Sequence, residues 1–306
     1  MLGLQYFSFA DLWSPLFLAL MLLLTAGYFV VIGPFSARFV GSAPVPLRLR
    51  ALFVLGMTAL YLAQGGPISL LGHMMFSFHM VSMALSYMVA VPLIMLGIPD
   101  WVWRAALRVS PFRRLSFLAR PIVAALLFNG LFSLYHIPVI HDYVMLHFTV
   151  HRIYYAVLFL ASGLMWWTLI NPLPEHRMAS GLGKIGFIFL NMVLLTPACG
   201  LIIFASQPLY ATYSDPDTWA RAMGYCVSGN PAALLETFGG PTFFGWLSPK
   251  VDQQVGGIAM KFIQEFIFAS MLAYVFYHWY KKENGQEDAE APTPPSELES
   301  GSLTRA

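Results

Sequence analysis

Long apolar stretches, separated by short polar or Gly/Pro-containing breaks, recur along almost the whole chain. A helix needs about 20 apolar residues to cross the hydrocarbon core of a bilayer. The stretches that approach this length lie at about 15–32, 51–64, 68–98, 121–137, 147–170, 185–205 and 256–280. Since 58% of the residues are hydrophobic and only 10% are charged, a soluble core could not absorb this much apolar surface. The sequence therefore predicts an all-α, polytopic membrane protein, a seven-transmembrane helix bundle in the cell membrane.

Lysine and arginine occur in alternate connections between these stretches. They are Arg38, Arg48 and Arg50 in the first connection, Arg104, Arg108, Arg113, Arg114 and Arg120 in the third, Arg177 and Lys184 in the fifth, and Lys281 and Lys282 after the last stretch. The N-terminus and the second and fourth connections contain none. Because basic loops stay on the cytoplasmic side, we expect the N-terminus outside and the C-terminus in the cytoplasm.

This orientation divides the chain into a membrane domain and a tail. Residues 1–282 form the predicted transmembrane domain, with a long outer loop at about 206–255. Residues 283–306 are acidic and contain Pro and Ser, a composition that predicts a disordered cytoplasmic tail. The lipid bilayer is the partner that the apolar composition requires, and we expect no nucleic-acid partner.

Six of the eight histidines fall at one depth of this predicted bundle. They are His73 and His79 in the third segment, His136 and His141 at and after the end of the fourth, and His147 and His151 at the start of the fifth. An imidazole in hydrocarbon must find a partner or lose several kcal/mol. The clustering therefore predicts one functional site near the outer face.

Helical spacing groups these side chains further. If 68–98 is one helix, a sector about 120° wide holds four donors, namely His73, His79, Met80 and Met83. His147 and His151 have the i, i+4 spacing that lets two imidazoles chelate one ion. An i, i+4, i+7 stripe that should face the bundle interior contains Asn129, Ser133 and His136.

The donor types then favour one metal. Imidazole and thioether without clustered carboxylates suit copper as Cu(I), whereas zinc would require more Cys or acidic ligands and Mg or Ca only oxygen. The predicted metal ligands are His79 and the pair His147/His151 first, followed by His73, His136, Met80 and Met83. We expect no catalytic residues, so the chain is not predicted to be an enzyme.

Three other interpretations stay open on the residues alone. Paired histidines on facing helices also hold haem in membrane cytochromes. A seven-helix zinc hydrolase would use His147 and His151, but Asp142 is then the only nearby outer carboxylate. A scaffold for other membrane subunits would bind no metal at all.

Two further residue pairs receive structural interpretations. Lys261 and Glu265, at i, i+4, are predicted to form a buried ion pair rather than a proton relay. Cys199 and Cys226 cannot form a disulfide framework, and no role is predicted for Cys226.

Several stretches between residues 76 and 281 resemble one known family. They read FSFHMVSMALSYMVAVPLIMLGIP from Phe76, FNGLFSLYHIP from Phe128, the run from His147 to Trp167 that ends in MWW, LLTPACGLIIFA from Leu194, YATYSDP from Tyr210 and DQQVGGIAMK from Asp252. Together they are similar to the CtaG family, the seven-helix assembly factors of caa(3)-type cytochrome c oxidase. The resemblance implies a factor needed to make active oxidase, with copper handling, oxidase subunits as partners and an extracytoplasmic copper donor.

The resemblance also implies positions for the site. His79 and Met80 match the family's His-Met pair, His136 matches its Tyr-His-x-Pro motif, and His147 and His151 match its histidine pair. Many relatives have a second histidine four residues after the first, where this chain has Met83. That departure keeps a ligand typical of Cu(I) and makes a zinc or haem site less expected.

Overall fold

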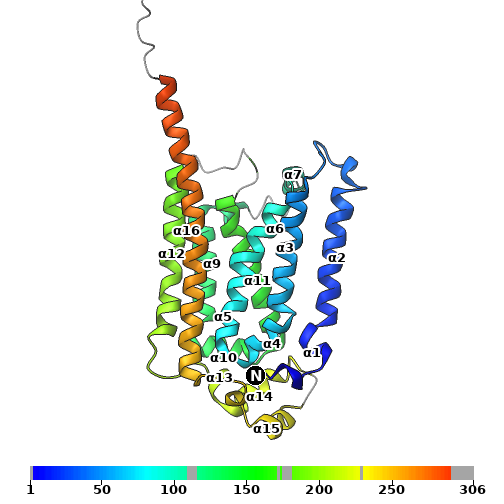
Figure 1. The fold of residues 1–306 in the computed structure, drawn as a ribbon, viewed down its shortest axis with the longest axis vertical. Coiled ribbons are helices and arrows are strands. Elements are labelled where there is room, and N and C mark those ends of the chain that lie inside the picture. Colours follow the sequence, from blue (N-terminus) through cyan, green and yellow to red (C-terminus); the bar gives the residue numbers. More distant parts are fainter. Residues whose placement is uncertain (1–2, 109–115, 171–172, 174–180, 228–229, 291–306) are drawn as a thin grey trace, which may run out of the picture.

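The structure, a computed structural model, describes residues 3–108, 116–170, 173, 181–227 and 230–290, and within these ranges it contains helices and no strand. The long helices lie side by side in one bundle (Figure 1). They are α2 (Pro15–Ile32), α3 (Leu47–Gln64), α5 (Phe76–Ala84), continued by a π-helical segment (Leu85–Ala90) and α6 (Val91–Gly97), then α9 (Pro121–Tyr135), α11 (Phe148–Ile170), α12 (Gly181–Ile203) and α16 (Pro249–Glu290).

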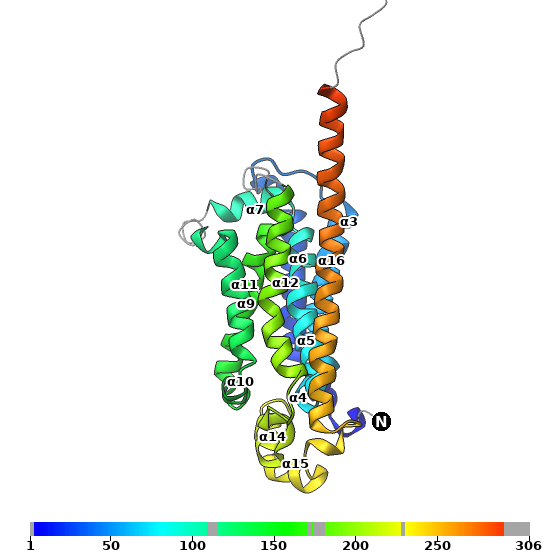
Figure 2. The same ribbon diagram turned by 90° about the vertical axis from the view of Figure 1, so that its left-hand side faces the viewer.

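Shorter helices connect the long ones. They are α1 (Phe9–Trp13), α4 (Pro67–Met74), α7 (Asp100–Leu107), α10 (Pro138–Met145), α13 (Ala211–Ser214), α14 (Pro216–Met223) and α15 (Pro231–Phe238). The N-terminus lies at the same end of the bundle as α10 and α13 to α15, whereas α16 extends past the opposite end (Figures 1 and 2). We call the end with the N-terminus the histidine end.

Six of the described helices are long and apolar enough to cross a membrane, and α9 with α10 makes a seventh span if this pair, bent by 80°, is taken together. The predicted all-α membrane bundle is confirmed. The basic segments around Arg38 and α7 and the C-terminal part of α16 lie at the end opposite the histidine end (Figure 1). Arg113, Arg114 and Arg177 lie outside the described residues.

The predicted third segment, 68–98, is not one helix. α4 ends at Met74, Met75 is extended (φ −136°, ψ 130°), and α5 begins at Phe76. Residues Leu47–Met74 instead form one span, so the chain reverses at Met75 and not at the predicted break at 65–67. A Cβ on Gly72 would lie only 3.2 Å from the Cα of His79, which shows how closely α4 packs against α5 after the turn. The prediction of a single helical sector for His73, His79, Met80 and Met83 is therefore wrong.

A carboxylate from a distant part of the chain stabilises this turn. Asp252, on the first turn of α16, accepts hydrogen bonds from the backbone N–H groups of Phe76 (2.7 Å) and Ser77 (3.3 Å) and from the Ser77 hydroxyl (2.5 Å). The first N–H groups of a helix have no partner within the helix, and a negative charge is favourable there. Gly256 permits the close approach, because a Cβ at this position would lie 2.9 Å from the Phe76 ring.

The next two residues of α16 hold the end of α12. Gln253 accepts from the N–H of Leu209 (2.7 Å) and donates to the Ile202 carbonyl (3.2 Å). Gln254 donates to the Ile203 carbonyl (3.0 Å). The motif Asp-Gln-Gln thus satisfies backbone groups at the start of α5 and at the end of α12.

The π-helical segment supplies one further link inside the bundle. Pro92 follows it, and a proline removes one helical hydrogen bond and clashes with the carbonyl four residues before it. In a π-helix the partner of the Tyr87 carbonyl would be the N–H five residues later, at position 92, which proline lacks. The Tyr87 carbonyl accepts instead from the Ser162 hydroxyl (2.7 Å) and from the Trp166 indole (2.9 Å), both on α11. The π-helical segment and α11 are therefore joined by polar contacts inside the bundle.

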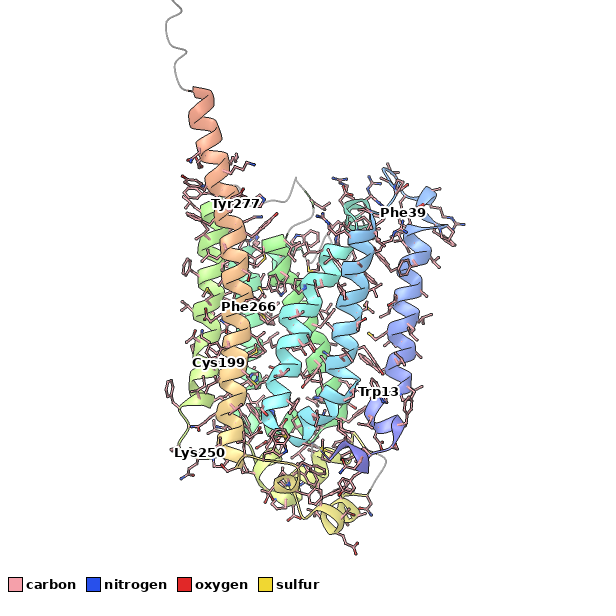
Figure 3. The ribbon with its side chains drawn as sticks, in the orientation of Figure 1. Trp13, Phe39, Cys199, Lys250, Phe266 and Tyr277 are labelled. Carbon is pink, nitrogen blue, oxygen red and sulfur yellow. The ribbon has the colours of Figure 1, made fainter. Side chains whose placement is uncertain are left out.

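α16 differs from its prediction in length and in the environment of its charges. It continues to Glu290, so the first residues of the predicted tail are helical, while 291–306 lie outside the described residues. Lys261 and Glu265 form the predicted pair, but their side chains are 27% and 36% exposed rather than buried. The outward face of α16 is aromatic, as at Phe266 and Tyr277 (Figure 3).

Replacing Asp252 by Ala should lower the free energy of unfolding by about 2 kcal/mol, because two N–H groups and a hydroxyl lose a charged acceptor. Chemical denaturation in detergent micelles would measure the change. Asp217→Ala, at an exposed position of α14, is the matched control and should stay close to the parent. Equal stability of the two variants would contradict this role for Asp252.

Candidate functional site

Three buried imidazoles from different helices meet at the histidine end. They are His79 on α5, His136 after the last residue of α9 and His141 on α10, with exposed fractions of 3%, 1% and 0%. The His79 ring centre lies 5.2 Å from that of His141 and 6.2 Å from that of His136. We call these three residues the inner cluster.

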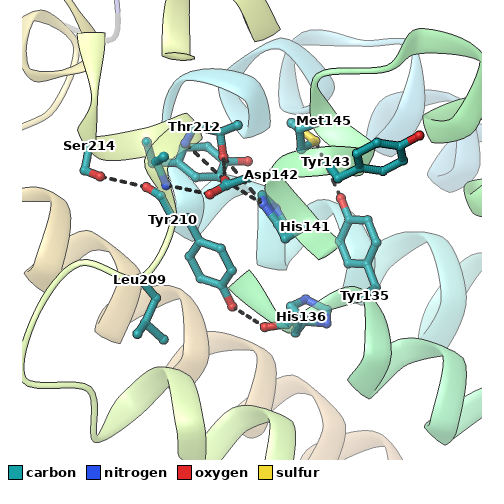
Figure 4. Close-up of polar contacts among 12 residues, drawn as sticks. Tyr135, His136, His141, Asp142, Tyr143, Met145, Leu209, Tyr210, Thr212 and Ser214 are labelled. Carbon is teal, nitrogen blue, oxygen red and sulfur yellow. Dashed lines mark hydrogen bonds and ion pairs between the residues drawn. The ribbon is translucent and has the colours of Figure 1, made fainter. Parts of the chain in front are cut away.

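The bend between α9 and α10 assembles the inner cluster. His136 ends α9, and Pro138 begins α10 at an angle of 80°, which turns His141 back toward α5. His136 Nδ1 lies 2.7 Å from the carbonyl oxygen of Phe132, and the His136 carbonyl accepts from the Tyr210 hydroxyl at 2.9 Å (Figure 4). His136 is therefore held both through its ring and through its backbone carbonyl.

Two buried tyrosines, Tyr210 just before α13 and Tyr213 within it, bond to backbone groups beside the inner cluster. The Tyr213 hydroxyl donates to the Gly72 carbonyl (2.7 Å), and Gly72 packs against the backbone of His79. The Tyr210 hydroxyl donates to the His136 carbonyl. Burial raises the pKa of both phenols well above the ordinary value, so they remain protonated donors.

Asp142 caps α13 and lies beside His141. Its carboxylate accepts from the Ala211 N–H (2.9 Å), the Thr212 N–H (3.2 Å) and the Thr212 hydroxyl (2.8 Å), and one oxygen lies 3.6 Å from His141 Nδ1 (Figure 4). These contacts occupy both carboxylate oxygens. Asp142 thus acts as a structural acceptor that holds α13 against α10.

Several imidazoles have one nitrogen with no partner. The Nε2 atoms are buried and make no hydrogen bond in His79, His136, His141 and His151. For His136 the other nitrogen faces a carbonyl, which can only accept, so Nδ1 holds the proton and Nε2 has a free lone pair. Buried polar atoms are rarely left unpaired, and an imidazole lone pair is the group that binds a metal.

A second group of histidines lines a cavity of about 730 Å³ between α2, α3, α4 and α11. His73 and His151 contact each other there, with ring centres 5.6 Å apart, and His73 Nδ1 lies 2.8 Å from the Ser69 carbonyl oxygen. His79 lines the same cavity. His79 is therefore shared between the cavity and the inner cluster.

The structure does not bring His147 to either group. His147 precedes α11, is exposed, and stacks on Tyr143 with ring centres 4.1 Å apart. Its Nδ1 lies 2.6 Å from the Tyr143 carbonyl oxygen. The predicted chelating pair of His147 and His151 is not assembled, because the contact with α10 holds the His147 ring away from the cavity.

The predicted methionines lie in the apolar core. Met80 and Met83 are both 0% exposed, and Met80 packs toward Gly256 on α16. Met145, which was not predicted, lines the cavity, and its sulfur lies 3.5 Å from the Tyr135 hydroxyl. Of the predicted donors, the structure therefore groups His79 with His136 and His73 with His151.

Pairs of imidazoles, rather than a complete ligand set, characterise the site. Within the described part of the chain, no group of three or more His, Cys, Asp or Glu side chains is arranged so that it could hold a metal ion. Two imidazoles that share an ion at metal–nitrogen distances of about 2.0–2.1 Å have ring centres about 5–6 Å apart. The separations of 5.2 Å (His79–His141) and 5.6 Å (His73–His151) fall in this range, and the 6.2 Å between His79 and His136 lies just above it.

The sequence prediction missed His141, which lies at the centre of the inner cluster. His141 appeared to lie in a loop, five residues after His136, so it was not included among the predicted ligands. The available signal was Pro138, since proline is common at the first position of a helix and here starts α10.

The model of one protein family, described as cytochrome c oxidase caa3 assembly factor, matches residues 26–282. The chain belongs to this family. The matched range contains the inner cluster, the histidines of the cavity and the Asp-Gln-Gln motif, which confirms the resemblance found in the sequence. The six or seven apolar helices fit a multi-pass protein of the cell membrane. No curated protein and no solved structure matches the chain.

In the metal-free protein, His136 should be neutral and should have its proton on Nδ1, because that nitrogen must donate to the Phe132 carbonyl. Solid-state NMR of protein labelled at histidine nitrogen distinguishes the two tautomers. Loss of the signal in His136→Gln would assign it. A proton on Nε2 would contradict the geometry described here.

Proposed function

We propose that this assembly factor binds copper, as Cu(I), at the inner cluster and provides it for a copper centre of the oxidase. The main support is the set of buried Nε2 atoms without partners. The nearby carboxylates of Asp142 and Asp252 are already used in capping, so the available donors are neutral. Imidazole binds copper and Zn²⁺ alike, but a buried site without anionic ligands favours the ion of lower charge, and Mg²⁺ and Ca²⁺ need oxygen ligands.

The proposal places the histidine end outside the cell. The described basic loops lie at the opposite end of the bundle, and basic loops stay in the cytoplasm. An extracytoplasmic copper donor would then meet the histidine end directly. Oxidase subunits in the same membrane would receive the ion there.

The proposed ligand set differs from the one that sequence spacing suggested. His79 and His136 remain in it, and His141 joins them. His73 and His151 belong to the cavity. His147 is exposed, and the predicted thioethers pack in the core, so His147, Met80 and Met83 are not included.

A haem site fits this arrangement less well. Tyr135 stacks on His79 with ring centres 5.6 Å apart, and Phe76 packs against the same ring. A porphyrin bound between the inner histidines would have to displace both. A scaffold without metal remains the second candidate, since assembly of subunits does not itself require a metal.

The purified parent protein should contain copper, and His79→Ala and His136→Gln should each lose the copper held at the inner cluster, because each change removes an unpaired imidazole nitrogen. Metal analysis by mass spectrometry measures this, with size-exclusion profiles to show that the variants fold. His278→Ala, an exposed histidine on α16, is the control and should keep the copper.

Three results would count against a copper site. Full retention of copper in both variants would contradict the ligand assignment. A parent protein that copurifies with oxidase subunits but contains no copper would favour the scaffold. A Soret absorption band would favour haem.

A further inference from the structure

The cavity is bounded on one side by a loosely packed helix. The first span, which contains α2, has only 17% of its apolar window buried, against 61% for the span that begins at Phe76. α2 stands at the edge of the bundle (Figure 1). The cavity wall opposite α2 comes from α4, α11 and the segment that follows α14.

Three donors that can bind a soft ion lie on this wall. His73 and His151 contact each other, and the buried Nε2 of His151 has no partner. Cys226, which follows α14, lines the same cavity as a free thiol and lies close enough to His73 to interact with it electrostatically. The thiol of Cys226 is partly exposed, whereas Cys199 is buried between helices.

These donors are connected to the inner cluster through one side chain. His79 is 97% buried, lines the cavity, and has an unpaired Nε2. Its ring contacts His141 and His136 on the other side. An ion on the cavity wall would therefore meet His79 before any other residue of the inner cluster.

We propose that Cys226, His73 and His151 form a second Cu(I) site, the receiving site, from which the ion passes to His79 and the inner cluster. This inference rests on the proposed function. The three side chains do not form a ready-made ligand set, so binding engages them in pairs, His73 with His151 or with Cys226. A low coordination number and exchangeable ligands allow an ion to be received and passed on.

The transfer is a ligand exchange without any redox step. Copper stays Cu(I) throughout. The Cys226 thiol loses its proton to solvent in the cavity when its sulfur binds the ion, because the thiolate is the metal ligand. When His79 takes the ion, the copper–sulfur bond breaks and the thiolate is protonated again.

The test uses the full-length purified protein and Cu(I) buffered by a chromophoric chelator. Cys226→Ser should lower the copper content by about half, because without the thiolate the His73–His151 pair competes poorly with the chelator for Cu(I). In the parent protein, Cu(I) should slow alkylation of Cys226 about tenfold, since a metal-bound sulfur is a poor nucleophile. X-ray absorption should show a sulfur ligand in the parent that is missing in Cys226→Ser. Cys199→Ser is the matched control and should behave as the parent does.

The outcomes separate this inference from the proposed function. His79→Ala should still protect Cys226 from alkylation, because the receiving site does not need the inner cluster to bind. A parent that binds copper while Cys226 reacts equally fast with and without Cu(I), or a Cys226→Ser variant with unchanged copper content, would overturn the receiving site alone. A parent that binds no copper would overturn both.

Discussion

The turn at Met75 depends on a single buried carboxylate, and most of the site depends on that turn. A break inside an apolar segment exposes backbone groups that water cannot reach, which costs several kcal/mol unless a partner is supplied. Asp252 supplies it from a position 176 residues later than Phe76 in the chain. The break separates His73, at the end of one span, from His79, at the start of the next. Without it, both imidazoles would lie on one helix and could not serve two different groups.

The capping roles of the two nearby carboxylates also limit which ligands the site can offer. Asp142 and Asp252 both satisfy backbone N–H groups, so both carboxylates are engaged in capping rather than directed at the imidazoles as ligands. The imidazoles, by contrast, are held through Nδ1 in His73 and His136, which directs Nε2 away from the helix that bears it. A site of neutral nitrogen donors in an apolar surrounding favours a soft ion of low charge, since burial of a divalent ion without anionic ligands would be costly.

The sequence was sufficient for the bundle and for the region of the site. Hydropathy located every long helix, and the clustering of six histidines located the end of the bundle at which four of the predicted donors pair. The sequence was insufficient where a contact between residues far apart in the chain determines the local structure. Met75 has no Gly or Pro beside it, so the turn has no local signal, whereas 65–67 has a strong one and yet lies within a span. Spacing alone likewise paired His147 with His151, because the contact of His147 with Tyr143 is a tertiary effect.

Packing beneath the inner cluster bears on the direction in which an ion can move. The Phe132 ring lies 4.3 Å from that of His136, and Phe128 and Tyr87 follow at the next level. Asn129 and Asn191 are buried there too, but they bond to each other (2.7 Å) and to their own helices. These amide groups are therefore already paired, whereas on the cavity side the Nε2 atom of His151 has no partner. Under the proposed function, this packing favours exchange of the ion at the histidine end over passage through the bundle.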